Sequence, residues 1–174
     1  SPNIRGWLAP LGGKLSWRWE KGRHRIVTDA VHSAGGRIAM QILHAGRYGY
    51  HPFSVSSMGK KAPINPFTPK ALSARGIEST IRDYVHTAVL AREAGYDGVE
   101  VMGSEGYLIN QFVSPQVNAR DDDWGGDAAR RRRFAVEIVS RMREAVGPDF
   151  IIIYRLSMLE LVPEGLAWPE IVEQ

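Results

Sequence analysis

The chain has 174 residues, of which 44% are hydrophobic and 24% are charged, and its formal net charge is +3. This is enough apolar material for one sizeable core, and no window approaches the roughly 18 consecutive apolar residues of a membrane span. The absence of cysteine excludes disulfides, thiol nucleophiles and iron–sulfur ligands within these residues. The small net charge does not favour nucleic acid as a partner. We therefore expect a cytoplasmic protein with neither a membrane nor a nucleic-acid partner.

Helical patterns alternate with short β-rich runs along the chain. The predicted helices cover residues 21–33, from Ile77 to about Gly95, and from Arg130 through an apolar stripe that runs from Phe134 to Ala145, and a last one begins at Pro169. The predicted strands cover 37–43, 98–102 and 150–154. The last strand is a continuous apolar run, which is typical of a strand buried on both faces. Loops are expected over 45–75 and 103–127.

This alternation predicts an α/β protein, with a parallel sheet and helices packed outside it. An open doubly wound sheet that binds a dinucleotide usually carries Gly-x-Gly-x-x-Gly after a strand, and residues 103–107 do not match. Polar residues instead follow each strand, where (β/α)8 barrels keep their chemistry. Because a barrel takes about 250 residues, we expect the chain to supply part of one. It would be a single incomplete barrel domain over residues 1–174, cut at both ends.

Two strand ends carry candidate binding residues. The amide of Gln41 can both donate to and accept from the edge of a planar heterocycle, and the alternative is a bond to neighbouring backbone. The charge of Arg155 is costly at a strand end unless it meets an anion or a polar ring edge. An ion pair with another strand-end carboxylate is the alternative for Arg155. No two histidines have a metal-binding spacing, so we predict no metal site and a structural role for His44.

The loop after the second predicted strand carries a candidate acid. A tyrosine hydroxyl has a reference pKa near 10, so Tyr107 can deliver a proton to a developing carbanion or enolate at neutral pH. Glu105, two residues earlier, could orient the substrate or polarise the proton transfer. Packing of Tyr107 with Leu108 and Phe112 is the alternative.

Charge is unevenly distributed in two places. Arg130 to Arg133 follow the acidic run Asp121 to Asp123 and Asp127, so we expect ion pairs there rather than a nucleic-acid surface. Residues 30–77 contain no acidic residue, and their basic residues are Arg37, Arg47, Lys60, Lys61, Lys70 and Arg75. On the active face such a segment would suit a phosphorylated ligand, and a solvated loop is the alternative.

Several ordered stretches of the chain resemble the old yellow enzyme family of NADH:flavin oxidoreductases. They are residues 41–47 (QILHAGR), 95–101 (GYDGVEV), 106–112 (GYLINQF) and 118–134, which contains N-x-R, WGG and R-x-RF. Within that family, residues 102–107 (MGSEGY) and 151–158 (IIIYRLSM) are similar to the bacterial NADPH-dependent 2,4-dienoyl-CoA reductases.

The resemblance implies an FMN-binding (β/α)8 barrel, of which this chain would cover roughly strands 3 to 5 with the flanking helices. Gln41 and Arg155 match positions that hydrogen-bond the flavin ring. Tyr107 matches the proton donor, and Glu105 matches an acidic residue that assists catalysis. NADPH would reduce the flavin system, FMN would pass a hydride to the conjugated acyl-CoA thioester, and Tyr107 would protonate the resulting dienolate.

Departures from the family pattern refine this expectation. Met102 and Glu105 replace a His and a His or Asn that anchor a carbonyl oxygen in simpler ene reductases, which favours the dienoyl-CoA branch. Gln116 is a candidate substrate-binding residue where that branch is expected to place an Arg. A second catalytic His, the FMN phosphate site, and modules for FAD, NADPH and a 4Fe-4S cluster would lie outside these residues. Two alternatives stay open: a flavin oxidoreductase acting on another activated alkene or an amine, and a non-catalytic truncated copy.

Overall fold

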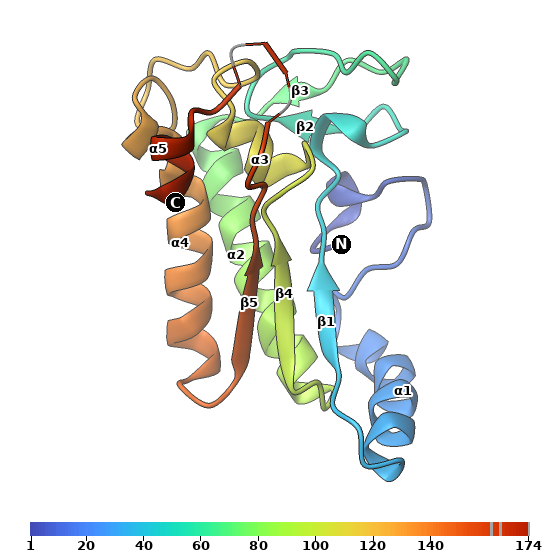
Figure 1. The fold of residues 1–174 in the computed structure, drawn as a ribbon. Helices are drawn as coiled ribbons and strands as arrows, with labels where there is room; N and C mark the ends of the chain where they lie inside the picture. The colour runs from blue at the N-terminus through green and yellow to red at the C-terminus, as the bar shows by residue number, and fades with distance from the viewer. Residues whose placement is uncertain (161, 164, 174) are drawn as a thin grey trace.

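The computed structural model describes residues 1–160, 162–163 and 165–173, and its centre is a three-stranded parallel sheet (Figure 1). The strands β1 (Ala39–Ile42), β4 (Gly98–Met102) and β5 (Ile151–Arg155) are hydrogen-bonded in that order. The register places Gln41 opposite Glu100, and Met102 opposite Arg155. The crossovers between these strands contain α2 (Ala74–Glu93) and α4 (Ala128–Val146).

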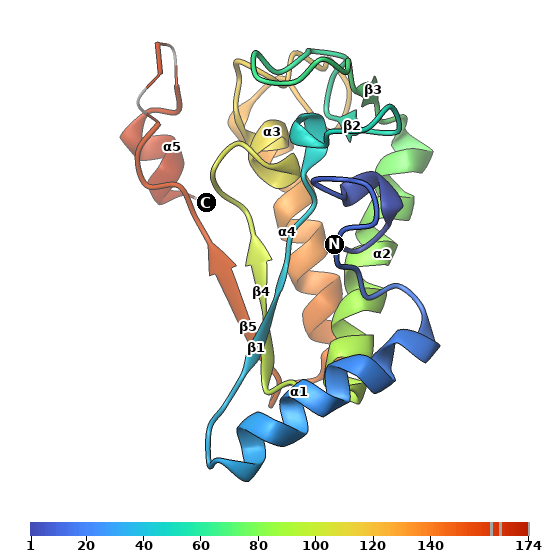
Figure 2. The same cartoon turned by 90° about the vertical axis from the view of Figure 1, so that its right-hand side faces the viewer.

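Both crossover helices cover the same face of the sheet (Figure 2). Fully buried side chains form the core between these layers: Ile77, Ile81 and Tyr84 of α2, Phe134, Ile138 and Met142 of α4, and Ile42, Val99 and Val101 of the sheet. A doubly wound sheet has helices on both faces, whereas consecutive neighbouring strands with all crossover helices on one face form the wall of a barrel. The prediction of a partial (β/α)8 barrel is therefore confirmed.

The two long helices begin at N-cap residues that precede their apolar stripes. Ser73 accepts a hydrogen bond from the backbone N–H of Gly76 (3.2 Å), and Asp127 accepts one from that of Arg130 (2.9 Å). The helices therefore start at Ala74 and Ala128, slightly before the predicted Ile77 and Arg130. The cap, rather than the first apolar residue, sets the start.

The segments predicted as loops contain further elements. They are α3 (Leu108–Val113), the 3-10 helix η3 (Gly46–Tyr48), and the short parallel pair β2 (Val55–Ser56) and β3 (Lys70–Ala71). The 3-10 helices η1 (Ile4–Gly6) and η2 (Arg18–Glu20) precede α1 (Lys21–Ser33), and α5 (Trp168–Val172) follows β5. None of the helices that the structure describes is long and apolar enough to cross a membrane.

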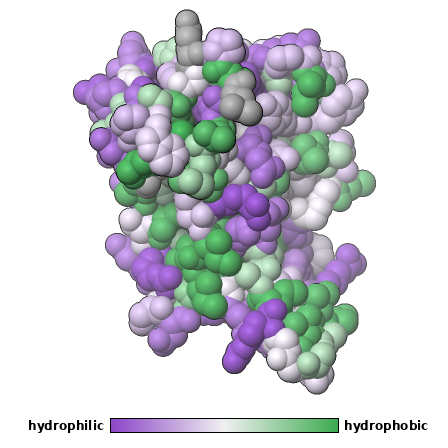
Figure 3. Space-filling view, in the orientation of Figure 1, coloured by the Kyte–Doolittle hydropathy of each residue, from purple (hydrophilic) through white to green (hydrophobic). Residues whose placement is uncertain are grey.

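The other face of the sheet is open (Figure 2). Ile151 and Ile153 of β5 are 53% and 42% exposed there, so the prediction that this strand is buried on both faces was wrong. Alternate residues of a strand point to opposite faces, and only one face of β5 meets a helix layer. Ile26 and Val27 of α1 are exposed as well, although the helix itself was predicted with the correct bounds, 21–33. Figure 3 shows hydrophobic residues over the lower part of the open face and hydrophilic ones above them.

Candidate active site

Three polar side chains meet on the open face, toward the carboxyl ends of the strands. The Nε2 of Gln41 donates to Oε1 of Glu100 at 2.8 Å, and the Nε of Arg155 donates to the same oxygen at 2.7 Å. The Nη2 of Arg155 also donates to Oε2 of Glu100, at 3.2 Å. The Arg155 guanidinium, with a smaller contribution from Gln41, holds the pKa of the Glu100 carboxyl below its usual value.

The two residues predicted to bind the flavin are therefore close together, and a carboxylate that the sequence analysis missed connects them. Gln41 binds this side chain rather than backbone, and Arg155 forms the strand-end ion pair that was its alternative. The available signal was Glu100 itself, which is the one charged residue in the apolar strand β4. Within the described residues, Gln41 Oε1 and Arg155 Nη1 make no hydrogen bond.

The loop after β4, residues 103–107, carries the predicted catalytic pair. Glu105 has φ +61° and Gly106 has φ +75°, both in the left-handed region that favours glycine. The backbone N–H of Glu105 donates to Ser157 Oγ (3.0 Å), and that of Gly106 donates to Asn110 Oδ1 (2.9 Å). These bonds hold the turn that places Tyr107 at the N-cap of α3.

Tyr107 is half-buried beside another tyrosine. Its ring lies edge-on to that of Tyr48, with 6.0 Å between the ring centres and an angle of 87° between the planes. Leu108 and Phe112, the alternative packing partners, are fully buried in the core on the helix-covered side. Within the described residues, the hydroxyl of Tyr107 makes no hydrogen bond.

A cavity of about 230 Å³ brings Glu105 and Gln116 together with Tyr48. The side-chain amide of Gln116 donates to the carbonyl of Pro163, and Lys60 Nζ donates to the backbone carbonyl of Gln116 (2.6 Å). Tyr107 does not line this cavity but packs on Tyr48, which does.

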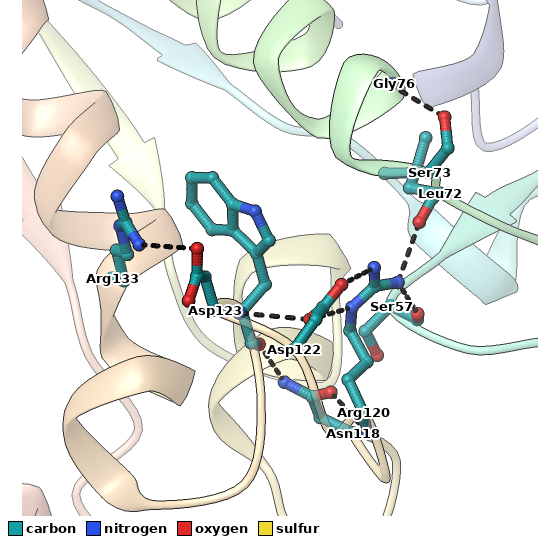
Figure 4. A network of polar contacts seen from close by, with 10 residues as sticks. Ser57, Leu72, Ser73, Gly76, Asn118, Arg120, Asp122, Asp123 and Arg133 are labelled. Atoms are coloured by element: carbon teal, nitrogen blue, oxygen red, sulfur yellow. Dashed lines mark hydrogen bonds and ion pairs between the residues drawn. The ribbon is translucent and has the colours of Figure 1, made fainter.

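The Arg-rich motif begins with a structural clamp (Figure 4). The Nη1 of Arg120 donates to the carbonyls of Ser57 (2.9 Å) and Leu72 (2.7 Å), and its Nε donates to Asp122 (2.9 Å). The side-chain amide of Asn118 closes the same loop by donating to the backbone carbonyls of Phe112 and Trp124. The clamp ties the loop after α3 to residues that flank β2 and β3.

The four consecutive arginines form ion pairs, as expected, but with two groups of partners. Arg130 and Arg133 pair with Asp127 and Asp123 (3.4 and 3.7 Å), whereas Arg131 and Arg132 pair with Glu170 and Glu173 near α5 (2.8 and 3.0 Å). The last two pairs depend on a contact that is distant in sequence.

The basic residues of 30–77 do not form one surface on the active face. Arg37 lies at the amino end of β1, where it donates to Asp97 (2.8 Å), whereas Lys60 lies beside Gln116 at the other end. Arg37 therefore does not contribute to a cationic surface at the carboxyl ends of the strands.

His44 has the structural role that was predicted. It is fully buried, and its Nδ1 accepts a hydrogen bond from the backbone N–H of Gly46 (3.1 Å). Burial lowers the pKa of His44 to about 3, so the imidazole is neutral at pH 7.

Known proteins share both the sequence and the fold. Residues 20–174 match the model of the NADH:flavin oxidoreductase / NADH oxidase family. The chain is 42% identical over 146 residues to the NADH oxidase of Thermoanaerobacter brockii, a match that covers 80% of the chain and 22% of that protein. It is 38% identical over 145 residues to the N,N-dimethylglycine/sarcosine dehydrogenase of Chromohalobacter salexigens, with coverages of 80% and 21%. The chain thus spans less than a quarter of either relative.

The fold is similar to that of a 2-naphthoyl-CoA reductase in complex with 2-naphthoyl-CoA. The TM-score is 0.93 at 28% sequence identity, and the match covers 99% of this chain and 29% of that one. The family model matches most of the length of this chain. The chain therefore belongs to the NADH:flavin oxidoreductase / NADH oxidase family, the FMN-binding old yellow enzyme family.

Proposed function

We propose that this chain is the central part of a larger FMN-dependent reductase, which reduces the conjugated double bonds of 2,4-dienoyl-CoA thioesters. The observation that carries the proposal is the convergence of Gln41 and Arg155 on Glu100, on the face that a closed barrel turns inward. Tyr107 follows the strand that lies between them. The similarity to a reductase that holds a CoA thioester supports this substrate class.

The residues present fit an isoalloxazine ring. Because Gln41 Nε2 and Arg155 Nε donate to Glu100, the Gln41 oxygen and a terminal Arg155 nitrogen remain for a ligand. An amide acceptor beside a guanidinium donor matches the N–H and carbonyl groups at a flavin edge. Bound FMN supplies the hydride. FAD, a 4Fe-4S cluster and NADPH would be held outside residues 1–174, which form an incomplete FMN domain.

Tyr107 is the proposed proton donor. Hydride addition to one carbon of the conjugated system leaves an electron pair at another, which takes the proton of the Tyr107 hydroxyl, and water then returns a proton to the phenolate. Glu105 and Gln116 line one cavity beside Tyr48, where Glu105 would assist the transfer and Gln116 would contact the acyl-CoA.

Flavin reoxidation tests the substrate class. The complete enzyme, reduced anaerobically with NADPH, is mixed with a 2,4-dienoyl-CoA or with 2-cyclohexenone, and we expect saturable reoxidation that is faster with the thioester. Faster reoxidation by cyclohexenone would favour the ene-reductase alternative. Reduction of the oxidised flavin by N,N-dimethylglycine would favour the amine alternative, which the similarity to a dimethylglycine dehydrogenase supports.

A fluorescence titration tests whether the 174-residue chain can bind FMN by itself or needs further parts of the enzyme. FMN is titrated with the 174-residue chain alone, and we expect no saturable quenching. In the described residues β1 and β5 each leave one strand edge unpaired, and one sheet face is uncovered. Stoichiometric binding would contradict the proposal that further barrel strands are needed.

A further inference from the structure

Gln111 of α3 is buried to 1% exposure, and its amide uses its whole hydrogen-bonding capacity. Its Oε1 accepts from the backbone N–H of Arg47 (3.0 Å) and from Ser56 Oγ (2.9 Å). Its Nε2 donates to the carbonyls of Gly106 (2.6 Å) and Ala45 (3.3 Å). One side chain thus joins three segments: the segment after β1 that contains η3, strand β2, and the loop before Tyr107.

Neighbouring backbone packs tightly around the side-chain amide of Gln111. Gly46 has φ +62°, and a Cβ there would overlap the side-chain amide of Gln111. The hydroxyl of Ser57 donates to the backbone carbonyl of Gln111 at 2.8 Å. Buried polar groups with every partner in place specify one arrangement, because any shift leaves groups unsatisfied.

We propose that Gln111 is a positioning residue for Tyr107. The proposal rests on the function proposed above, in which Tyr107 donates the proton. Gly106 precedes Tyr107 directly, so the bond to its carbonyl fixes the peptide from which Tyr107 extends. The left-handed φ values of Glu105 and Gly106 need such support from surrounding structure.

Gln111 also acts on Tyr107 indirectly, through the aromatic ring of Tyr48. The bond from the Arg47 N–H to Oε1 holds the start of the η3 turn, and the next residue, Tyr48, packs edge-on against Tyr107. Gln111 therefore fixes the backbone of Tyr107 on one side and its aromatic neighbour on the other. An error of about 1 Å in the placement of a reacting group can cost about 100-fold in rate.

The test uses Gln111→Met and Gln111→Glu in the complete, flavin-loaded enzyme, with both half-reactions measured. Met keeps the length but makes none of the four bonds, whereas Glu keeps the acceptor and turns an oxygen toward the Gly106 carbonyl. We expect reoxidation at saturating 2,4-dienoyl-CoA to fall by about 10- to 100-fold, and flavin reduction by NADPH to change less than about twofold. The control, Thr28→Val, removes a buried bond to the Ala94 carbonyl (2.7 Å) near the amino ends of the strands, and should change neither rate.

Two further measurements separate positioning from general damage. On a Tyr107→Phe background, Gln111→Met should cause no further loss, because Gln111 acts through Tyr107. In Gln111→Glu, burial raises the pKa of the new carboxyl, and its protonated form can donate to Gly106. The reoxidation rate relative to wild type should therefore rise as the pH falls, and the Met variant should show no such rise.

Each outcome has a distinct meaning. An equal loss from Gln111→Met with and without the Tyr107 hydroxyl overturns the positioning role alone. An unchanged rate in the single variant Tyr107→Phe overturns the proposed function and the inference with it. If the Met variant fails to retain flavin, the pH response of the Glu variant decides, and a flat response counts against the inference.

Discussion

Gln41 and Arg155 donate hydrogen bonds to the same oxygen atom, Oε1 of Glu100, from the two strands that flank β4. The shared acceptor fixes the direction of both side chains. The amide of Gln41 must turn its oxygen away from Glu100, and the guanidinium of Arg155 keeps one terminal nitrogen for another partner. Under the proposed function, Glu100 would orient the two groups for the flavin without touching it.

Substitution of Glu100 by Gln tests this arrangement. The loss of the charged acceptor weakens three hydrogen bonds and lets both donor side chains rotate, so we expect FMN affinity in the complete apoenzyme to fall by about tenfold. Fluorescence titration of the apoenzyme with FMN measures the change. The same substitution at Glu78, whose partner is Arg141 on the helix surface, should leave the affinity unchanged. Equal affinities for the two variants would show that Glu100 does not orient the donors.

The Arg120 clamp is expected to contribute strongly to stability. The Arg120 side chain is 10% exposed. A lysine has a single ammonium group in place of the planar guanidinium, so it cannot bind the carbonyls of Ser57 and Leu72 and the carboxylate of Asp122 at the same time. We predict that Arg120→Lys lowers the free energy of unfolding by about 2–3 kcal/mol, as measured by urea unfolding. Arg130→Lys alters an ion pair whose Arg side chain is 53% exposed, and should cost less than about 1 kcal/mol. Comparable losses in the free energy of unfolding of the two variants would contradict the stabilising role of the Arg120 clamp.

The buried His44 predicts a pH dependence of stability. The usual pKa of 6.5 falls to about 3 in the folded chain, so between these values the unfolded chain binds more protons. Stability contributed by the neutral ring is therefore full above pH 6.5 and is lost as the pH falls toward 3, by at most about 1.4 kcal/mol per pH unit.

His44→Asn isolates this contribution, because the Asn oxygen can accept the Gly46 N–H without titrating. Urea unfolding of both proteins between pH 7 and pH 4 should show that the wild type loses stability more steeply. A difference between the two that stays constant with pH would mean that His44 does not titrate on unfolding.

Local patterns predicted most of the architecture. The apolar run 150–154 and the stripe Ile77, Ile81, Tyr84 correspond to β5 and α2 because they reflect which side chains meet the core. The burial of β5 was misjudged because an apolar strand does not reveal whether both of its faces are covered. The helix α3 was missed because all six of its residues are buried, including the polar Asn110 and Gln111, so the helix has no exposed face to give its sequence a polar period.

The candidate site was less predictable because its connections are long-range. Gln41 and Arg155 could be chosen as polar residues at strand ends, but Glu100 lies within an apolar strand and was not singled out. Gln111 has four hydrogen-bond partners on three separate segments, which no local spacing indicates. The pairing of Arg131 with Glu170 likewise requires the folded chain.

The most direct test of the central claim is the rate at which the reduced flavin of Tyr107→Phe is reoxidised by a 2,4-dienoyl-CoA. Removal of the hydroxyl takes away the proton but leaves the ring against Tyr48, so we predict at least about 100-fold slower reoxidation and an unchanged rate of flavin reduction by NADPH. Tyr50→Phe, which alters an exposed ring that packs on Phe67, serves as the matched control. Reoxidation of the Tyr107→Phe enzyme at the wild-type rate would contradict the assignment of Tyr107 as the proton donor.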